Sequence, residues 1–238
     1  MALNVIQWNS QGIMSKKDEL LQLVNDHQPM IIAIQETMLH QNNNFRLPNY
    51  SSVMKPGTFN RRSHGGVAIF VHESTPIYKI INLQTPLQAV AIQVSLKCKL
   101  TICSIYNSRS HSLTEHLLTQ LVQQLPPPIL LLGDLDAYHP LWGSPEADTR
   151  GCRVANFVQA NSLNVLNDGS PTRIAGTSET VVDVSLASPA LQTQVSWSVL
   201  PSPYDSDQYP IKICFNTIVR NTLTIKYCIN KIKLGHFQ

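Results

Sequence analysis

The sequence lacks any apolar run of the length that a transmembrane helix needs. Wholly apolar runs such as Ile129–Leu132 contain only a few residues, whereas a helix that crosses a bilayer needs about 20. The first residues, Met1–Trp8, lack both a basic segment and a small-residue cleavage site, so we expect no secretory signal. The sequence therefore predicts a soluble protein without a membrane partner, in the nucleus or the cytoplasm.

Paired cysteines are also missing. The five cysteines form an odd number and contain no C-x-x-C pair, which argues against a zinc site or a disulfide framework. Scattered thiols are typical of a reducing, intracellular compartment.

Charged residues are scarce, at 14% of the chain, and the formal net charge of +3 is unevenly distributed. Residues 217–238 hold 4 of the 18 basic residues and no acidic residue, so residues 1–216 carry 14 − 15 = −1. Nucleic-acid-binding domains are often strongly basic, and this one is not. A carboxylate cluster that holds a divalent cation would nevertheless present positive charge locally. Composition alone leaves the partner open.

Apolar, β-branched runs alternate with polar segments along the chain, which is typical of strands. The predicted strands are Leu3–Trp8, Met30–Gln35, Val67–Val71, Ile77–Leu83, Ala89–Leu96, Leu100–Tyr106, Ile129–Gly133, Val181–Leu186, Val195–Leu200 and Ile211–Phe215. Three helices are predicted: one that begins at Ser15 with Asp18 as its capping-box partner, one over Leu113–Leu125, and one over Cys152–Asn161. Many strands with few helices between them predict an α/β fold of two packed sheets flanked by helices. We expect one domain over residues 1–216 and a separate tail over residues 217–238.

Polar residues follow or interrupt the apolar strands at several places. They are Asn9, Glu36, Tyr106, Asp134, Asp183 and Asp207. Each alone is more typical of a turn than of a ligand, but strand ends at one edge of a sandwich converge in space. Carboxylate and amide oxygens are hard ligands that suit Mg²⁺ or Mn²⁺ better than zinc.

Several short runs resemble motifs of the endonuclease/exonuclease/phosphatase superfamily, in order along the chain. They are Gln7–Asn9, Gln35–Thr37, Ile105–Asn107, Gly133–Ser144 and Ser206–Ile211. More narrowly, Asn167–Arg173 and Val182–Leu186 resemble the apurinic-like endonuclease domains of arthropod non-LTR retrotransposons. The resemblance implies a DNase I-like, four-layer α/β sandwich that hydrolyses a DNA phosphodiester with Mg²⁺ or Mn²⁺. The 3′-hydroxyl left by this cleavage would prime reverse transcription at the target site, by the reverse transcriptase of the parent element if the domain is part of a longer polyprotein.

The resemblance also implies a role for each candidate residue. Glu36 would be the main metal ligand, with Asn9 and Asp207 beside it. Asp134 would orient or activate the attacking water, and Tyr106 would contact the scissile phosphate. Asp183 would steady the site. Thr172 and Ser206 would lie by the DNA.

Two of these catalytic positions depart from the family pattern. The family usually has Asn where this chain has Asp136, and His where it has Gln208. An ionised Asp136 offers no hydrogen-bond donor to a phosphate, and Gln208 can neither titrate nor carry charge. Because loss of a general acid–base group costs about 10²–10⁴ in rate, we expect weak or absent cleavage. The alternatives are a DNA-binding relic without turnover and, less favoured, a phosphodiesterase or phosphatase acting on nucleotides or phosphoinositides.

Overall fold

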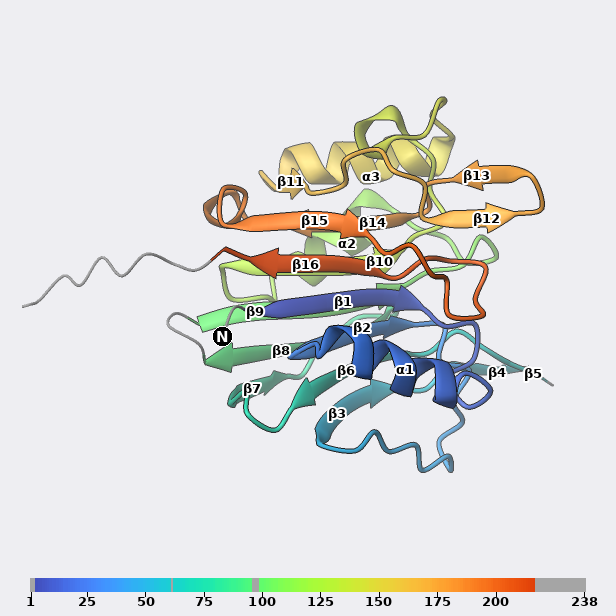
Figure 1. Ribbon diagram of the computed structural model, residues 1–238. Coiled ribbons are helices and arrows are strands. Elements are labelled where there is room, and N and C mark those ends of the chain that lie inside the picture. Colours follow the sequence, from blue (N-terminus) through green and yellow to red (C-terminus); the bar gives the residue numbers. More distant parts are fainter. Residues whose placement is uncertain (1–2, 61, 96–98, 217–238) are drawn as a thin grey trace, which may run out of the picture.

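Two six-stranded sheets pack face to face, with helices against their outer faces (Figure 1). The computed structural model describes residues 3–60, 62–95 and 99–216. The expected four-layer α/β sandwich of DNase I type is confirmed. The predicted tail lies outside the described residues. Within the described residues, no helix combines the length and apolar character that spanning a membrane requires.

The first sheet has the strand order β15-β16-β1-β2-β6-β3. Its strands are β1 (Asn4–Asn9), β2 (Ile31–Gln35), β3 (Tyr50–Lys55), β6 (Val67–His72), β15 (Val195–Val199) and β16 (Ile211–Phe215). The second sheet has the order β11-β14-β10-β9-β8-β7. Its strands are β7 (Ile77–Ile81), β8 (Gln88–Ser95), β9 (Lys99–Tyr106), β10 (Ile129–Asp134), β11 (Asn164–Val165) and β14 (Asp183–Ala187). Two hairpins complete the strands, β4 (Thr58–Asn60) with β5 (Arg62–His64) and β12 (Arg173–Ala175) with β13 (Ser178–Thr180).

The helices differ at their ends from the sequence-based expectation. Helix α1 spans Lys17–His27, and the predicted capping box is wrong, because the Ser15 hydroxyl donates to the Gly12 carbonyl at 2.9 Å instead of capping the helix. Helix α2 spans Glu115–Val122 and is shorter than predicted.

Helix α3 spans Thr149–Ala160 and begins three residues earlier than predicted, because the Asp148 carboxylate caps it by accepting from the Gly151 amide at 2.6 Å. The two short 3₁₀ helices are η1 (Pro140–Trp142) and η2 (Pro189–Leu191).

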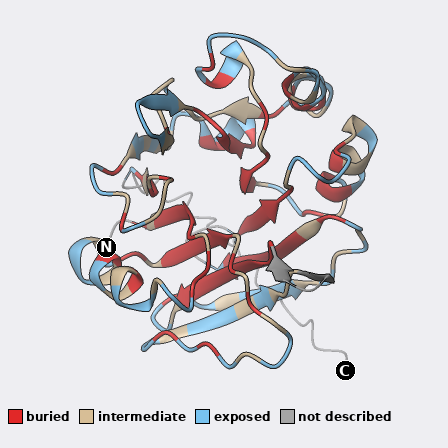
Figure 2. Ribbon diagram, turned by 90° about the vertical axis from the view of Figure 1, so that its right-hand side faces the viewer, coloured by how far each residue is buried: buried red, intermediate tan, exposed pale blue. Residues whose placement is uncertain are grey.

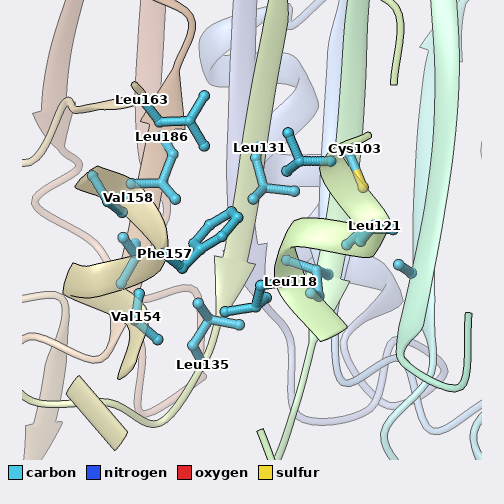
Figure 3. Close-up of a cluster of buried hydrophobic side chains, with 14 of the residues drawn as sticks. Cys103, Leu118, Leu121, Leu131, Leu135, Val154, Phe157, Val158, Leu163 and Leu186 are labelled. Atoms are coloured by element: carbon cyan, nitrogen blue, oxygen red, sulfur yellow. The ribbon is translucent and has the colours of Figure 1, made fainter. Parts of the chain in front are cut away.

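Buried side chains form one cluster between the sheets and one beneath each helical layer. Figure 2 shows that burial is concentrated in the central strands. Under α2 and α3, Phe157 is fully buried and lies among Leu131, Leu135 and Leu186 (Figure 3). Burial of apolar area on both faces of each sheet holds the sandwich together and fixes the ends of its central strands.

Candidate active site

The strand register brings the polar strand ends to one edge of the sandwich. Strands β1 and β2 are parallel, and Asn9 lies opposite Gln35, so that Glu36 follows beside Asn9. In the second sheet β10 lies between β9 and β14, with Asp134 opposite both Tyr106 and Asp183. Strands β1 and β2 run toward the side from which the β12–β13 hairpin projects (Figure 1).

Asn9 connects the two sheets at this edge. Its side-chain nitrogen donates to Glu36 Oε2 at 3.1 Å and to Asp134 Oδ2 at 2.7 Å. Its side-chain oxygen accepts from the backbone amide of Gln11 at 3.0 Å. The amide nitrogen, rather than the oxygen, therefore faces the carboxylates. In this arrangement Asn9 acts as a hydrogen-bond donor, and its role as a metal ligand stays a prediction.

Asp134 is the most extensively bonded carboxylate of the site. Besides Asn9, the side-chain nitrogen of Gln208 donates to Oδ2 at 2.9 Å, and the backbone amide of Asp136 donates to Oδ1 at 3.0 Å. Burial, opposed by these hydrogen bonds and reinforced by the nearby Asp136 charge, raises the pKa of Asp134. A carboxylate fixed by three donors and made more basic by burial is suited to orient a water and accept its proton.

Glu36 and Tyr106 interact across the two sheets. Burial, together with the charges of Asp134 and Asp207, raises the pKa of Glu36. An interaction with the Tyr106 phenol opposes the rise in the pKa of Glu36, and burial among carboxylates raises the pKa of Tyr106 as well. The phenol therefore stays protonated and acts as a donor.

Asp183 and Thr172 are almost fully buried. The Thr172 hydroxyl is fully buried and accepts from the backbone amides of Val182 and Asp183, both at 3.3 Å. Burial raises the pKa of Asp183 well above its ordinary value, and the Asp134 charge adds to this. A weak interaction with Thr172 opposes the shift, but neither carboxylate oxygen of Asp183 completes a hydrogen bond within the described residues. The predicted contact of Thr172 with DNA stays a prediction, because its hydroxyl anchors backbone here.

The loop before β16 supplies the last three predicted residues. The Ser206 hydroxyl donates to the Asn9 carbonyl at 2.8 Å and accepts from the Gln208 amide at 3.2 Å. The indole of Trp8 donates to the Gln208 carbonyl at 3.2 Å. Asp207 is ion-paired with Arg173, whose Nη2 lies 2.8 Å from Oδ2. A contact of Ser206 with DNA stays a prediction.

Three arginines beside the carboxylates were not predicted as site residues. They are Arg109, Arg150 and Arg173. Arg109 Nε lies 3.6 Å from Asp136 Oδ1, and Asp136 itself has a left-handed backbone conformation with φ of 50°. Arg173 directly follows Thr172 and ends the run Asn167–Arg173. Its place in that run was the one feature of the sequence that could have identified it as a site residue.

The donor chemistry of the site fits a divalent cation, although no group of three or more His, Cys, Asp or Glu side chains with metal-binding spacing occurs in residues 3–60, 62–95 and 99–216. Asp207 Oδ1 is buried and has no hydrogen-bond partner within those residues. The mutual repulsion of Glu36, Asp134 and Asp207 contributes to the raised pKa of Glu36. Crowded carboxylate oxygens are the ligands that Mg²⁺ and Mn²⁺ prefer, and the roles of Glu36 and Asp207 as metal ligands stay predictions.

Comparison with known proteins shows which proteins this chain resembles. Residues 100–212, a little under half of the chain, match the family described as "Endonuclease-reverse transcriptase". The solved endonuclease domain of TRAS1, a telomere-specific non-LTR retrotransposon, superimposes with a TM-score of 0.72 at 21% identity, over 91% of this chain and 99% of that one. The chain is similar to non-LTR retrotransposon endonuclease domains. The resemblance inferred from the sequence is thereby confirmed.

Other relatives share the sequence or the fold. Two Drosophila melanogaster proteins, described as probable RNA-directed DNA polymerases from the transposons X-element and BS, are 23% and 27% identical over 176 residues, which is 73% and 72% of this chain. The chain spans only 19% of the length of each. An AP endonuclease from Leishmania major has the same fold, with a TM-score of 0.70 at 12% identity over 90% of this chain and 88% of that one.

Proposed function

We propose that the domain is a metal-dependent DNA endonuclease of the non-LTR retrotransposon type. It would nick target DNA by phosphodiester hydrolysis and leave a 3′-hydroxyl for target-primed reverse transcription. The observation that carries the proposal is the Asn9 amide, which ties Glu36 of one sheet to Asp134 of the other at 3.1 and 2.7 Å. We infer that the domain extends over residues 1–216, that it acts inside the cell, and that a reverse transcriptase on the same polyprotein is its partner.

The side chains proposed for the chemical step come from both sheets. Asp134 orients the attacking water and accepts its proton, since its raised pKa makes it a better base than an exposed aspartate. Tyr106 keeps its proton and donates toward the phosphate. Glu36 and Asp207 would hold a divalent cation, which when bound neutralises charge on the phosphate. Asp183 lies opposite Asp134 on the neighbouring strand and would steady the site.

Asp136 and Gln208 would slow the chemical step. Gln208 donates to Asp134 at 2.9 Å, so it keeps the orienting hydrogen bond that a donor at this position can make. It cannot carry a proton between groups or bear a positive charge. Asp136 adds a carboxylate near the phosphate in place of an amide donor.

A nicking assay on supercoiled plasmid, with Mg²⁺ and separately with Mn²⁺, tests the proposal. We expect slow conversion to the open circle, abolished by Glu36→Gln and unaffected by Lys79→Gln, an exposed residue of the outer strand β7. Salt-dependent binding without any nicking would favour the DNA-binding relic. Faster turnover of a small phosphate ester or a nucleotide than of plasmid would favour the phosphodiesterase alternative.

A further inference from the structure

The arginines around the carboxylates differ in how fully their hydrogen bonds are used. Arg150 donates to four backbone carbonyls, so its guanidinium is committed to holding loops together. The acceptors are the carbonyl oxygens of Asn107, Ser108, His111 and Leu135. Arg109 bonds Asp148 at 3.2 Å and lies with its guanidinium carbon 4.8 Å from the ring centre of Tyr138. Arg109 also lies with Nε 3.6 Å from Asp136 Oδ1 and, like Arg173, has no hydrogen bond from Nη1 within the described residues; Arg173 differs from it in contacting Asp207.

Arg173 is placed differently. Its Nε and Nη2 both contact the same oxygen, Asp207 Oδ2, at 2.9 and 2.8 Å. Within the described residues no hydrogen bond involves its second amino group, Nη1. The side chain is 32% exposed, so this unused edge of the guanidinium is accessible to a ligand.

The position of Arg173 is fixed by its backbone and by charge. Its backbone forms an isolated antiparallel β-bridge with that of Gln208. The backbone amide of the next residue, Ile174, donates to the Asp207 carbonyl at 2.8 Å. Burial lowers the pKa of Arg173, but the charges of Asp207, Asp136 and Asp134 more than compensate and raise it. The contacts of Nε and Nη2 with Asp207 Oδ2 turn the guanidinium toward Asp207.

We propose that Arg173 is a substrate-contacting residue whose free guanidinium edge binds a non-bridging oxygen of the scissile phosphodiester while Asp207 holds the other edge. This rests on the proposed function. A phosphodiester that approaches Glu36, Asp134 and Asp136 meets like charge. The neighbouring side chain that reaches Asp134, Gln208, is neutral.

Arginine suits the role for a geometric reason. Its planar guanidinium can bond two acceptors along different edges at once, whereas lysine presents a point charge. Held in place by Asp207, it loses little freedom on binding, and fixed donors aimed at developing charge commonly contribute about 10²–10³ in rate. Arg173 would therefore supply the positive charge that Gln208 cannot.

Binding to duplex DNA in EDTA tests the contact without any metal. The variants are Arg173→Gln, Arg173→Lys and Arg173→Gln/Asp207→Asn, with Lys79→Gln as the charge-matched control; thermal unfolding verifies that each is folded. Each phosphate contact contributes about 0.9 to the slope of log K against log salt. We expect Arg173→Gln to lower this slope by about 1, Arg173→Lys to keep it, and Lys79→Gln to leave it unchanged.

The double variant shows whether a lower slope in Arg173→Gln comes from loss of a phosphate contact or from the unpaired charge of Asp207. It removes both partners of the ion pair and keeps the net charge of the site. If Arg173 binds phosphate, the slope stays low in the double variant. Recovery of the wild-type slope would mean that unpaired Asp207 repels the DNA, and the proposal would be overturned. An unchanged slope in Arg173→Gln, or an equal loss in Lys79→Gln, would overturn it too.

Plasmid nicking distinguishes failure of this inference from failure of the proposed function. We expect Arg173→Gln to nick at least about 100-fold more slowly than wild type, and the loss to shrink when Gln208→His is added. If wild type nicks plasmid and Arg173→Gln nicks it equally fast, the role of Arg173 is refuted, whereas the proposed endonuclease function stands. If no variant nicks plasmid but the slope of log K against log salt still depends on Arg173, the phosphate contact stands and the proposed endonuclease function is refuted.

Discussion

Asp134 and Asp183 lie directly opposite each other on the antiparallel strands β10 and β14, and both side chains are buried. Burial raises the pKa of both, and the charge of Asp134 raises that of Asp183 further. Two like charges so close in a low dielectric medium oppose each other strongly. The pair stores electrostatic free energy at the point where the proposed water would be activated.

This relationship predicts that Asp183→Asn stabilises the fold at neutral pH. The folded-state pKa of Asp183 is raised, so the native state binds more protons than the unfolded state once the pH exceeds the unfolded pKa. Stability then falls as pH rises, by up to about 1.4 kcal/mol per pH unit for one group, until the folded pKa is passed. The variant lacks this loss.

Thermal unfolding of wild type and Asp183→Asn between pH 4 and pH 8 measures the effect. We expect the melting temperature of the variant to exceed that of wild type by a margin that grows with pH, at about 2–4 °C per kcal/mol. Glu73→Gln, an exposed acid after β6, controls for general loss of charge. A margin that shrinks as pH rises would contradict the raised pKa.

Glu36 leads to a second prediction, on metal binding. Burial and neighbouring carboxylates raise its pKa, so its ionised form destabilises the metal-free fold above the unfolded pKa. Glu36→Gln should therefore raise the melting temperature in EDTA. Wild type should gain stability on adding Mg²⁺, by about 2.7 kcal/mol at one hundred times the dissociation constant, whereas the variant should not. A Mg²⁺ shift that persists in Glu36→Gln would remove Glu36 as the main ligand.

Gly143 makes a third prediction, on the loops that carry the site. Its φ is 108°, and an added Cβ would lie 2.4 Å from the Cα of Gly169. Gly143→Ala should cost about 3 kcal/mol, from backbone strain and from pushing the two loops apart. Gly176→Ala is the matched control, because its φ is 64° but nothing lies within 4 Å; we expect about 1 kcal/mol. Chemical denaturation compares the two, and equal losses would show that the loop contact is unimportant.

The sequence predicts the central strands well because their side chains are buried on both faces, which produces continuous apolar runs. Strand β3 was missed, since it is an edge strand whose residues are mostly exposed or half-buried and polar. The hairpin β12–β13 was missed as well, because its three-residue strands carry no period that a pattern can detect.

The site was predictable in part for a related reason. A polar residue directly after an apolar run identifies a strand end, and parallel neighbours carry such ends to one edge, as with Asn9 and Glu36. The pairing of Arg173 with Asp207 joins residues 34 positions apart through a local backbone bridge. No periodicity encodes such a contact, and the same holds for the bond between Gln208 and Asp134.

The last prediction is that Asp136→Asn and Gln208→His together increase nicking. Asn tolerates the left-handed backbone of Asp136 as readily as Asp does, so the first change should not strain the loop. It removes a carboxylate from beside the phosphate and adds an amide donor. The second places an imidazole where the Gln208 side chain now contacts Asp134, and the charge of that carboxylate would favour the protonated ring.

Because both groups act on one transition state, their effects should be non-additive, and either change alone should do little. The double variant should nick supercoiled plasmid about 10²–10⁴ times faster than wild type with Mg²⁺, and adding Glu36→Ala should abolish that activity. If wild type nicks as fast as the double variant, Asp136 and Gln208 are functional substitutes and do not impair the site. If the double variant folds and binds Mg²⁺ but never cleaves, the impairment lies elsewhere, and the loops that approach the DNA become the next residues to replace.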